Sequence, residues 1–298
     1  MSDVGVGIIG TGYIANAGHA PAAVATPGAR LAASLSRSTA GARDFLSTFD
    51  APGAKPYDDL GAFLADPDIG LVVVLSPDGL HFPQAEASLR AGKHVLVEKP
   101  MALSAGEART LVDLATTSGL VLAAGYHLRC HVGHELLRRR IHEIGTLRHL
   151  RVSWPFPIAE TNWRAQGEIA KWWSLSATGT HCLDLARWYA DDMADWAQFR
   201  SVLSNSRWHV QTDESAVIAA QFASGPTLDV FSSMQFDGET RLELLGDDGS
   251  AVAVNTFGPH GRGDITINGA LLAYAPENPF VRQLTGVLAA IRGEGPPP

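Results

Sequence analysis

A chain of 298 residues with 46% hydrophobic and 18% charged residues is long enough for two globular domains with substantial cores. The net charge of −8 argues against a nucleic acid or an anionic membrane as a partner. The sequence has two cysteines, no apolar stretch long enough to span a membrane and no N-terminal signal segment, which together predict a cytoplasmic protein.

The first predicted strand, Val4 to Ile9, leads directly into a glycine-rich turn, Gly10-Thr11-Gly12-Tyr13-Ile14-Ala15. This is the G-x-G-x-x-A form of the dinucleotide fingerprint. Gly10 permits a tight turn, Gly12 lets a pyrophosphate approach the backbone, and Ala15 lets the following helix pack on the strand. We therefore predict that residues 10–14 bind the pyrophosphate of a dinucleotide cofactor, next to a helix N-terminus.

The next predicted strand, Arg30 to Leu35, ends in Ser36-Arg37-Ser38, where NAD-preferring sites usually carry an acidic residue. Here Arg37 is expected to stack on adenine or to pair with a 2′-phosphate, with Ser36 and Ser38 as additional donors. This pattern favours NADP(H) over NAD(H). The alternative is a helix-capping serine beside a solvated arginine.

A continuous apolar strand, Gly70 to Leu75, is followed by Ser76-Pro77-Asp78-Gly79 and by His81. Because these residues follow the carboxyl end of a predicted parallel strand, they are expected at the cofactor site. Pro77 would stiffen a loop under the cofactor. His81 either contacts the cofactor or only caps and packs the next helix.

The predicted strand His94 to Val97 ends in Glu98-Lys99-Pro100. Ligands bind beyond the carboxyl ends of parallel strands, so Glu98 and Lys99 are expected where the chemistry occurs; the alternative is a solvated turn. A capping box at Ser104 opens a further helix, and Leu120 to Ala124 forms one more strand. The alternation of strands and helices predicts a doubly wound parallel sheet, a Rossmann domain, over residues 1–122.

The second half is predicted to be an α+β domain, residues 123–298, with a large, open and mostly antiparallel sheet. Its strands are separated by turn pairs such as Asp237-Gly238, and a last helix covers Glu277 to Arg292. The predicted strands are Leu147 to Trp154, Phe199 to Leu203, Ser215 to Phe222, Thr227 to Phe236, Thr240 to Leu245, Ala251 to Asn255, Ile265 to Ile267 and Leu271 to Tyr274.

Several side chains after the domain junction are candidate ligands or binding groups. On a helix, His127, His131 and His134 have acceptable zinc-ligand spacing, with Cys130 nearby, but no second cluster completes a site, so no metal is predicted. In an irregular segment, Trp163 offers a stacking face and Arg164 offers a donor to a substrate oxygen or to the nicotinamide amide; the alternative is ordinary loop packing.

Several motifs together resemble the Gfo/Idh/MocA family, which contains glucose–fructose oxidoreductase and inositol dehydrogenase. They are Ser76-Pro77-Asp78, Gly92-Lys93-His94 and Glu98-Lys99-Pro100, then Gly125-Tyr126-His127-Leu128-Arg129, Gly145-Thr146-Leu147 and Gly179-Thr180-His181-Cys182-Leu183-Asp184. The resemblance covers at least the first two-thirds of the chain. Its most specific part is Glu-Lys-Pro combined with a later His-x-x-Asp.

The resemblance implies an NAD(P)-dependent dehydrogenase or reductase acting on a sugar, a polyol or a related compound. Carried over from the family, Lys99 points at the reacting oxygen and His181 is the acid/base, near the positive end of a helix. Glu98 positions Lys99 and the cofactor ribose. The Lys99–Pro100 peptide is often cis in the family. His127 and Arg129 are expected at the cofactor and Asp184 at the substrate. The face of the second sheet that no helix covers is expected to be buried in a homodimer or higher homo-oligomer.

The chain departs from the family pattern four residues before His181, where many members carry an aspartate and this chain has Ala177. Trp172 and Trp173 replace the usual glycine-rich segment, and Trp172 is either a substrate contact or core. A flatter or less polar substrate is expected. A cofactor-binding sensor without turnover is the rival function, and retention of Lys99 and His181 favours the enzyme. The Gly-Glu-Gly-Pro-Pro-Pro end suggests a truncated or divergent C-terminus.

Overall fold

The computed structural model describes residues 3–191 and 195–298 and divides the chain into two compact units. Unit 1 comprises Met1–His127 together with Phe280–Pro298, and unit 2 comprises Leu128–Pro279. These bounds differ from the predicted division in two respects: the first unit extends to His127 and not to residue 122, and it also includes the end of the chain. The C-terminal segment, expected in the second domain, packs with the first.

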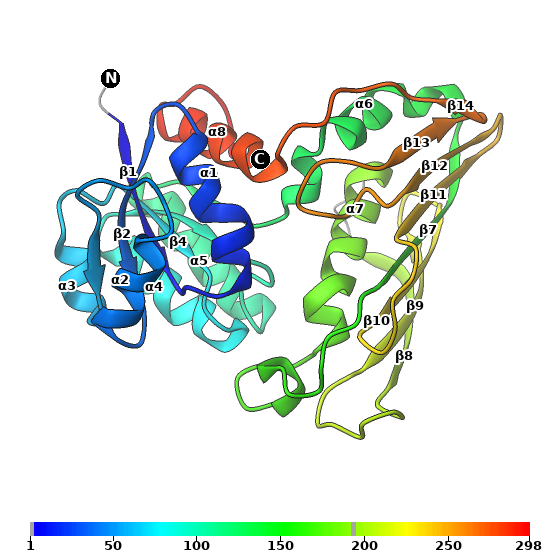
Figure 1. Ribbon diagram of the computed structural model, residues 1–298. Coiled ribbons are helices and arrows are strands. Elements are labelled where there is room, and N and C mark those ends of the chain that lie inside the picture. Colours follow the sequence, from blue (N-terminus) through cyan, green and yellow to red (C-terminus); the bar gives the residue numbers. More distant parts are fainter. Residues whose placement is uncertain (1–2, 192–194) are drawn as a thin grey trace. The chain divides into compact units, whose positions relative to one another are not determined.

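Unit 1 is built on a six-stranded sheet in the order β3-β2-β1-β4-β5-β6, in which every pair is parallel (Figure 1). The strands are β1 Val4–Ile9, β2 Ala29–Leu35, β3 Lys55–Tyr57, β4 Leu71–Val74, β5 His94–Val97 and β6 Leu122–Ala124. Strands β4 and β5 are buried on both faces, as their continuous Val and Leu runs predict.

Helices cover both faces of this sheet. They are α1 Ala20–Ala25, α2 Thr39–Leu46, α3 Leu60–Ala65, α4 His81–Arg90, α5 Ala105–Ser118 and α8 Pro279–Ile291. Val6, Ile8 and Val73 pack on one face with residues of α1, α2 and α8, whereas Val72 and Val95 pack on the other with residues of α3, α4 and α5. The predicted doubly wound Rossmann fold is confirmed.

Helix α8 joins unit 1 because its apolar side is complementary to the face of the sheet that α1 covers. Phe280, Leu284, Val287 and Leu288 are each at most 3% exposed and share one core with Val6 and Ile8. In Figure 1 the red α8 lies beside the blue α1. A pattern read along the chain shows that this helix is amphipathic but does not identify the distant core that it completes.

Unit 2 contains an eight-stranded sheet in the order β14-β13-β12-β11-β7-β10-β9-β8, in which only β7 and β10 pair in parallel. The strands are β7 Leu147–Pro155, β8 Trp196–Ser204, β9 Ser215–Phe222, β10 Thr227–Ser233, β11 Arg241–Gly246, β12 Ser250–Val254, β13 Asp264–Ile267 and β14 Ala270–Leu271. Helices α6 Val132–Arg140 and α7 Thr180–Ala190 pack on one face. The predicted open, mostly antiparallel sheet is confirmed.

Strand β14 is shorter than predicted: it ends at Leu271, whereas the expected strand ran to Tyr274. Beyond Leu271 the amide of Leu272 still donates to the carbonyl of Ile265 at 2.7 Å, and the Tyr274 hydroxyl donates to the carbonyl of Gly263 at 2.6 Å.

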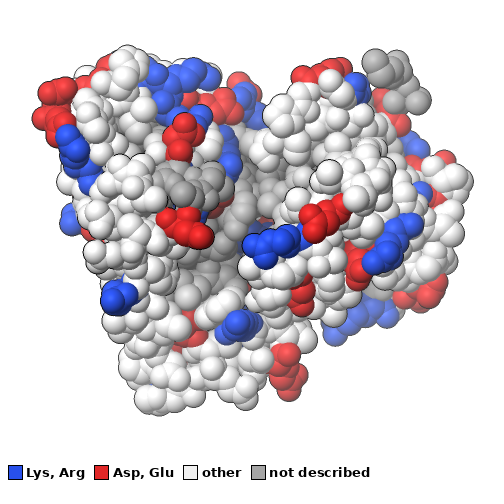
Figure 2. Space-filling view, turned by 180° about the vertical axis from the view of Figure 1, so that it is seen from behind, with Lys and Arg blue, Asp and Glu red and all other residues white. Residues whose placement is uncertain are grey.

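Charges of both signs are interspersed on the surface that Figure 2 shows. Many are paired, as in the cross-strand ladder of Asp229, Arg151 and Glu243 on the sheet of unit 2. In the part of the chain that the structure describes, no helix has the length and apolar character needed to cross a membrane.

Candidate active site

Strands of the parallel sheet end in a single row. The register pairs Ile9 with Leu35 and Val74, and it pairs Val97 with Val74 and Ala124. The residues that follow these strands therefore emerge along one edge of the sheet. This row contains most of the predicted cofactor residues of unit 1, namely Gly10, Ser36, Ser76, Glu98 and the segment before His127.

The glycine turn fits a pyrophosphate. Gly10 has a φ of +96°, and a Cβ there would lie 2.8 Å from the carbonyl oxygen of Leu75. A Cβ on Gly12, by contrast, would meet no atom within 4 Å, so the missing side chain leaves open space beside the turn. The amide of Asn16 donates to the carbonyls of Thr11 and Gly12 at 3.1 and 2.9 Å and holds the turn. Open space beside bare backbone is what a diphosphate needs.

The residues predicted to flank the adenosine moiety are accessible. Tyr13 is 76% exposed, Ile14 and Ser36 are half-buried, and Arg37 is exposed. Ser38 is the N-cap of α2, since its hydroxyl accepts from the amide of Gly41 at 3.1 Å. Ser38 is thus the helix-capping serine of the alternative interpretation, and a cofactor role for Ser36, Arg37 and Ser38 stays a prediction.

His81 braces two loops. Its imidazole is 1% exposed, with Nε2 2.7 Å from the carbonyl oxygen of Ser76 and Nδ1 2.7 Å from that of Pro100. Both ring nitrogens are thus engaged by backbone, which leaves no polar atom of His81 for the predicted cofactor contact. The histidine thus connects Pro100 to the loop that contains Pro77 and the buried Asp78.

A buried carboxylate supports Lys99. Glu98 is 5% exposed, and its Oε2 accepts from the amide of Lys99 at 3.0 Å. Its Oε1 lies 2.9 Å from Nε2 of His19, a residue that the sequence patterns did not single out. The Lys99–Pro100 peptide is cis, as the resemblance implied. The sequence offered no signal for His19 beyond its position one helical segment after the glycine turn.

His127, His131 and His134 each make a different structural contact. His127, which closes unit 1, stacks on Phe280 with ring centroids 4.5 Å apart. In unit 2, Nδ1 of His131 accepts from the amide of Gly133 and caps α6, and Nδ1 of His134 lies 2.8 Å from the Tyr189 hydroxyl. Among residues 3–191 and 195–298, no three His, Cys, Asp or Glu side chains are grouped to hold a metal ion.

In unit 2, His181 lies on α7 against an aromatic wall. It is 3% exposed, and its ring centroid is 5.3 Å from that of Trp154 on β7. One turn later, Asp184 accepts two hydrogen bonds from Arg129, at 2.6 and 2.8 Å. Burial raises the pKa of Asp184, and this bidentate pair opposes that rise. The structure thus pairs Asp184, a predicted substrate residue, with Arg129, a predicted cofactor residue. Direct contact of either residue with substrate or cofactor stays a prediction.

The helix bearing His181 begins earlier than expected, with a π turn at Leu175–Gly179. Its first amides are capped from a distance, because the carboxylate of Asp213 accepts from the amides of Trp173 and Leu175 at 2.8 and 2.9 Å and from the Ser174 hydroxyl. Burial raises the pKa of Asp213, although these bonds oppose the rise. His181, the second residue of α7, therefore lies one π turn after the first helical residue, and an effect of the helix dipole on it stays a prediction.

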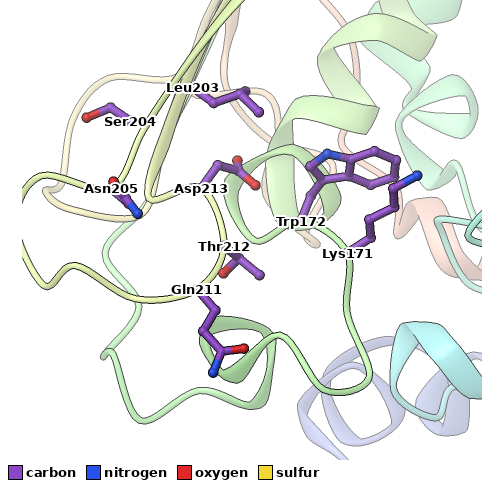
Figure 3. A pocket seen from close by; sticks show the side chains of 8 residues that line it. All are labelled: Lys171, Trp172, Leu203, Ser204, Asn205, Gln211, Thr212 and Asp213. Atoms are coloured by element: carbon purple, nitrogen blue, oxygen red, sulfur yellow. The ribbon is translucent and has the colours of Figure 1, made fainter.

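Unit 2 contains a pocket of about 270 Å³, which Trp172 and Lys171 help to line (Figure 3). Lys171 lies over the Trp172 ring, with Nζ 4.5 Å from its centroid. Two of the lining side chains bind backbone: Thr212 donates to Arg164 at 2.9 Å, and Asn205 donates to Val210 at 3.1 Å. These polar atoms hold the loops together, and the substrate role of Trp172 stays a prediction.

The other predicted substrate residues are preorganised by each other. The Arg164 guanidinium lies over the Trp163 ring at 4.2 Å, a cation–π contact, and Asn162 caps the short helix that contains both. Ala177, at the position of the family aspartate, is 9% exposed and belongs to a small apolar cluster with Trp173 and Met234. An aspartate at 177 would place a charge beside these apolar groups.

Two family models match the chain. The model of the oxidoreductase family with an NAD-binding Rossmann fold, GFO_IDH_MocA, matches residues 4–126, and the GFO/IDH/MocA C-terminal domain matches residues 135–252. Together the two models cover the glycine turn, Lys99 and His181.

Individual relatives agree with these models. The chain is 30% identical over 255 residues to 1,5-anhydro-D-fructose reductase of Ensifer adhaerens, covering 82% of this chain and 75% of the relative. It resembles the solved structure of KijD10, a 3-ketoreductase from Actinomadura kijaniata in complex with NADP and TDP-benzene, with a TM-score of 0.89, 25% identity and coverage of 99% and 92%. It also resembles GenD2 from gentamicin A biosynthesis in complex with NAD, with a TM-score of 0.84, 26% identity and coverage of 99% and 88%.

The open glycine turn, the supported Lys99 and the match of both halves lead to one assignment. The chain is an NAD(P)-dependent dehydrogenase or reductase that acts on CH–OH or C=O groups, and it belongs to the Gfo/Idh/MocA family of sugar and polyol oxidoreductases.

Proposed function

We propose that the protein transfers a hydride between NADP(H) and a carbon–oxygen centre of a sugar, polyol or related small compound. The observation that carries this proposal is the arrangement of Lys99, whose main chain is held by a buried carboxylate at the same sheet edge as the open glycine turn. The nicotinamide would supply the hydride for reduction. Lys99 would polarise the substrate oxygen, and His181 would deliver the proton that completes the alcohol.

The apolar surroundings of Ala177 support a substrate with fewer charged or hydroxyl-rich contacts at this position. The protein, loaded with NADPH, should therefore be tested against 1,5-anhydro-D-fructose, keto-sugars, aldehydes and diketones by loss of the reduced-nicotinamide signal. We expect turnover of at least one compound. If NADPH binds but is not consumed, the reverse assay with NADP⁺ and polyols follows; failure to bind NADPH would contradict the proposal.

The preference for NADP(H) rests on Arg37, which is exposed after β2, in a segment Ser36-Arg37-Ser38 that has no acidic residue to hold a ribose 2′-hydroxyl. We expect Arg37→Ala to raise the Kd for NADPH about 10- to 100-fold, because a charge-assisted bond to the 2′-phosphate is lost. The Kd for NADH should change little. Arg43→Ala, on the exposed side of α2, is the matched control. Equal loss of both cofactors in Arg37→Ala would argue against the NADP preference.

We also propose a homo-oligomer that buries the outer face of the eight-stranded sheet. Val202 and Val217 face each other across β8 and β9 and are 68% and 47% exposed. Sedimentation velocity tests this proposal. A cytoplasmic location is proposed on the basis of the two cysteines in the sequence.

A further inference from the structure

Each unit has a π turn that ends at, or just before, a buried histidine. In unit 2 the turn Leu175–Gly179 comes just before His181, and in unit 1 the turn Ala15–His19 ends on His19 itself. Single π turns inside helices are frequent at functional sites, because the extra residue redirects the side chains that follow. His181 already has a predicted role. His19, at the end of the helical segment that follows the glycine turn, has no predicted role.

His19 is the first member of a short chain of contacts that ends at Lys99. Its Nε2 lies 2.9 Å from Oε1 of Glu98, and both residues are 5% exposed. The other oxygen of Glu98 accepts from the Lys99 amide at 3.0 Å. The carboxylate fits because position 125 is glycine, where a Cβ would come within 2.7 Å of Oε1. One carboxylate thus connects the first helical segment with the backbone of Lys99.

The surroundings of Glu98 make its charge depend on His19. Burial favours the neutral acid and would raise the pKa of Glu98. The hydrogen bond and charge of His19, followed by the charges of Lys99 and His127, overcome this effect and lower the pKa from 4.5 to about 2. The neighbouring group from α8 is the apolar ring of Phe280, which contacts the edge of His19 at a centroid distance of 5.0 Å.

We propose that His19 is a positioning residue for hydride transfer: it keeps Glu98 ionised, and ionised Glu98 holds the Lys99 backbone so that the ammonium group is directed at the reacting oxygen. The contact chain from His19 through Glu98 to the Lys99 amide carries this inference. It rests on the role proposed for Lys99. If His19 served only to pack the helix, the ionisation of Glu98 would not depend on it.

The test uses lysine methyl groups as reporters and needs neither cofactor nor substrate. The sequence has four lysines, Lys55, Lys93, Lys99 and Lys171, so the signals of a ¹³C-dimethylated sample can be assigned by substitution. In the unsubstituted protein, the Lys99 signal should show no step from Glu98 between about pH 5 and 8. In His19→Leu, a step should appear in this range, because Glu98 takes up a proton. It should vanish in the double variant His19→Leu/Glu98→Gln.

Two variants separate this role from packing. His19→Gln restores an N–H donor, so the step in the Lys99 titration should move back below about pH 5. His19→Asn is too short to reach Glu98, so the step should remain between about pH 5 and 8. His19→Asn also replaces His19→Leu if His19→Leu does not fold. His149→Leu is the matched control, because Nε2 of His149 is also 2.9 Å from a carboxylate, Asp229, on the sheet of unit 2. Its Lys99 titration should equal that of the unsubstituted protein.

A Lys99 titration in His19→Leu or His19→Asn without the additional step would overturn the inference, as would a step that persists in the double variant. Once a turned-over compound is known, kcat in His19→Leu should fall about 10- to 100-fold at pH 6 and recover toward alkaline pH, with the KM for NADPH unchanged. If the unsubstituted protein turns over no compound but the Lys99 titration behaves as expected, the proposed function is contradicted and the dependence of Glu98 on His19 still holds.

Discussion

Replacing Lys99 with alanine is expected to lower kcat/KM about 10²- to 10⁴-fold, while the Kd for NADPH stays within about threefold. Lys99 follows β5, and its amide is bound to the carboxylate of Glu98. Alanine leaves this backbone bond in place and removes only the ammonium group. The expected loss therefore reports on the stabilisation of charge at the substrate oxygen and not on the fold.

Two further variants sharpen this measurement. Lys99→Met keeps the length of the side chain without its charge and should be as impaired as Lys99→Ala. Lys93→Gln is the matched control at the opposite end of β5, where the Lys93 ammonium binds the carbonyls of Asp66 and Ile69 at 3.0 and 2.8 Å. It should retain kcat/KM. Full activity in Lys99→Met would exclude a role for the lysine charge.

The parts of the fold that the sequence predicted well are those set by local chemistry. Strand β1 and the turn at Gly10 follow from an apolar run that meets a residue able to adopt a positive φ, and β5 follows from a short buried run that ends in Glu98. Once these strands are parallel, the register alone brings their carboxyl ends into one row. The location of the predicted cofactor residues at one edge required no knowledge of long-range contacts.

The parts that it missed depend on contacts between residues far apart in the chain. His19 and Glu98 are 79 positions apart, and Asp213 caps a helix start about 40 positions earlier. A buried carboxylate can be satisfied by any donor that the fold brings to it, so a local pattern does not identify its partner. The same reason explains why the sequence did not show where the helix bearing His181 begins: a π turn precedes α7, and a distant side chain caps it.

Phe280→Ala is expected to destabilise unit 1 by about 3–5 kcal/mol, the usual cost of truncating a fully buried phenylalanine. Its ring is 1% exposed, stacks on His127 and contacts the edge of His19. The ring also fills the space beside Gly18, where a Cβ would lie 2.8 Å from it. Because the surrounding groups include two imidazoles and a glycine backbone, the cavity would not close by a simple shift of aliphatic side chains.

Native-state hydrogen exchange measures this effect separately for each unit. Amides of β1 and β4, which share the core of α8, should exchange about 10²- to 10⁴-fold faster in Phe280→Ala, whereas amides of β9 and β10 in unit 2 should be unchanged. Phe280→Leu should give a smaller acceleration, and Thr285→Ala, on the exposed side of α8, should give none. Acceleration confined to the strands of unit 2 would contradict the assignment of α8 to unit 1. Faster exchange in β1 and β4 would instead show that a helix some 270 residues away in sequence completes the core below the glycine turn, so that the cofactor site depends on the end of the chain as well as on its beginning.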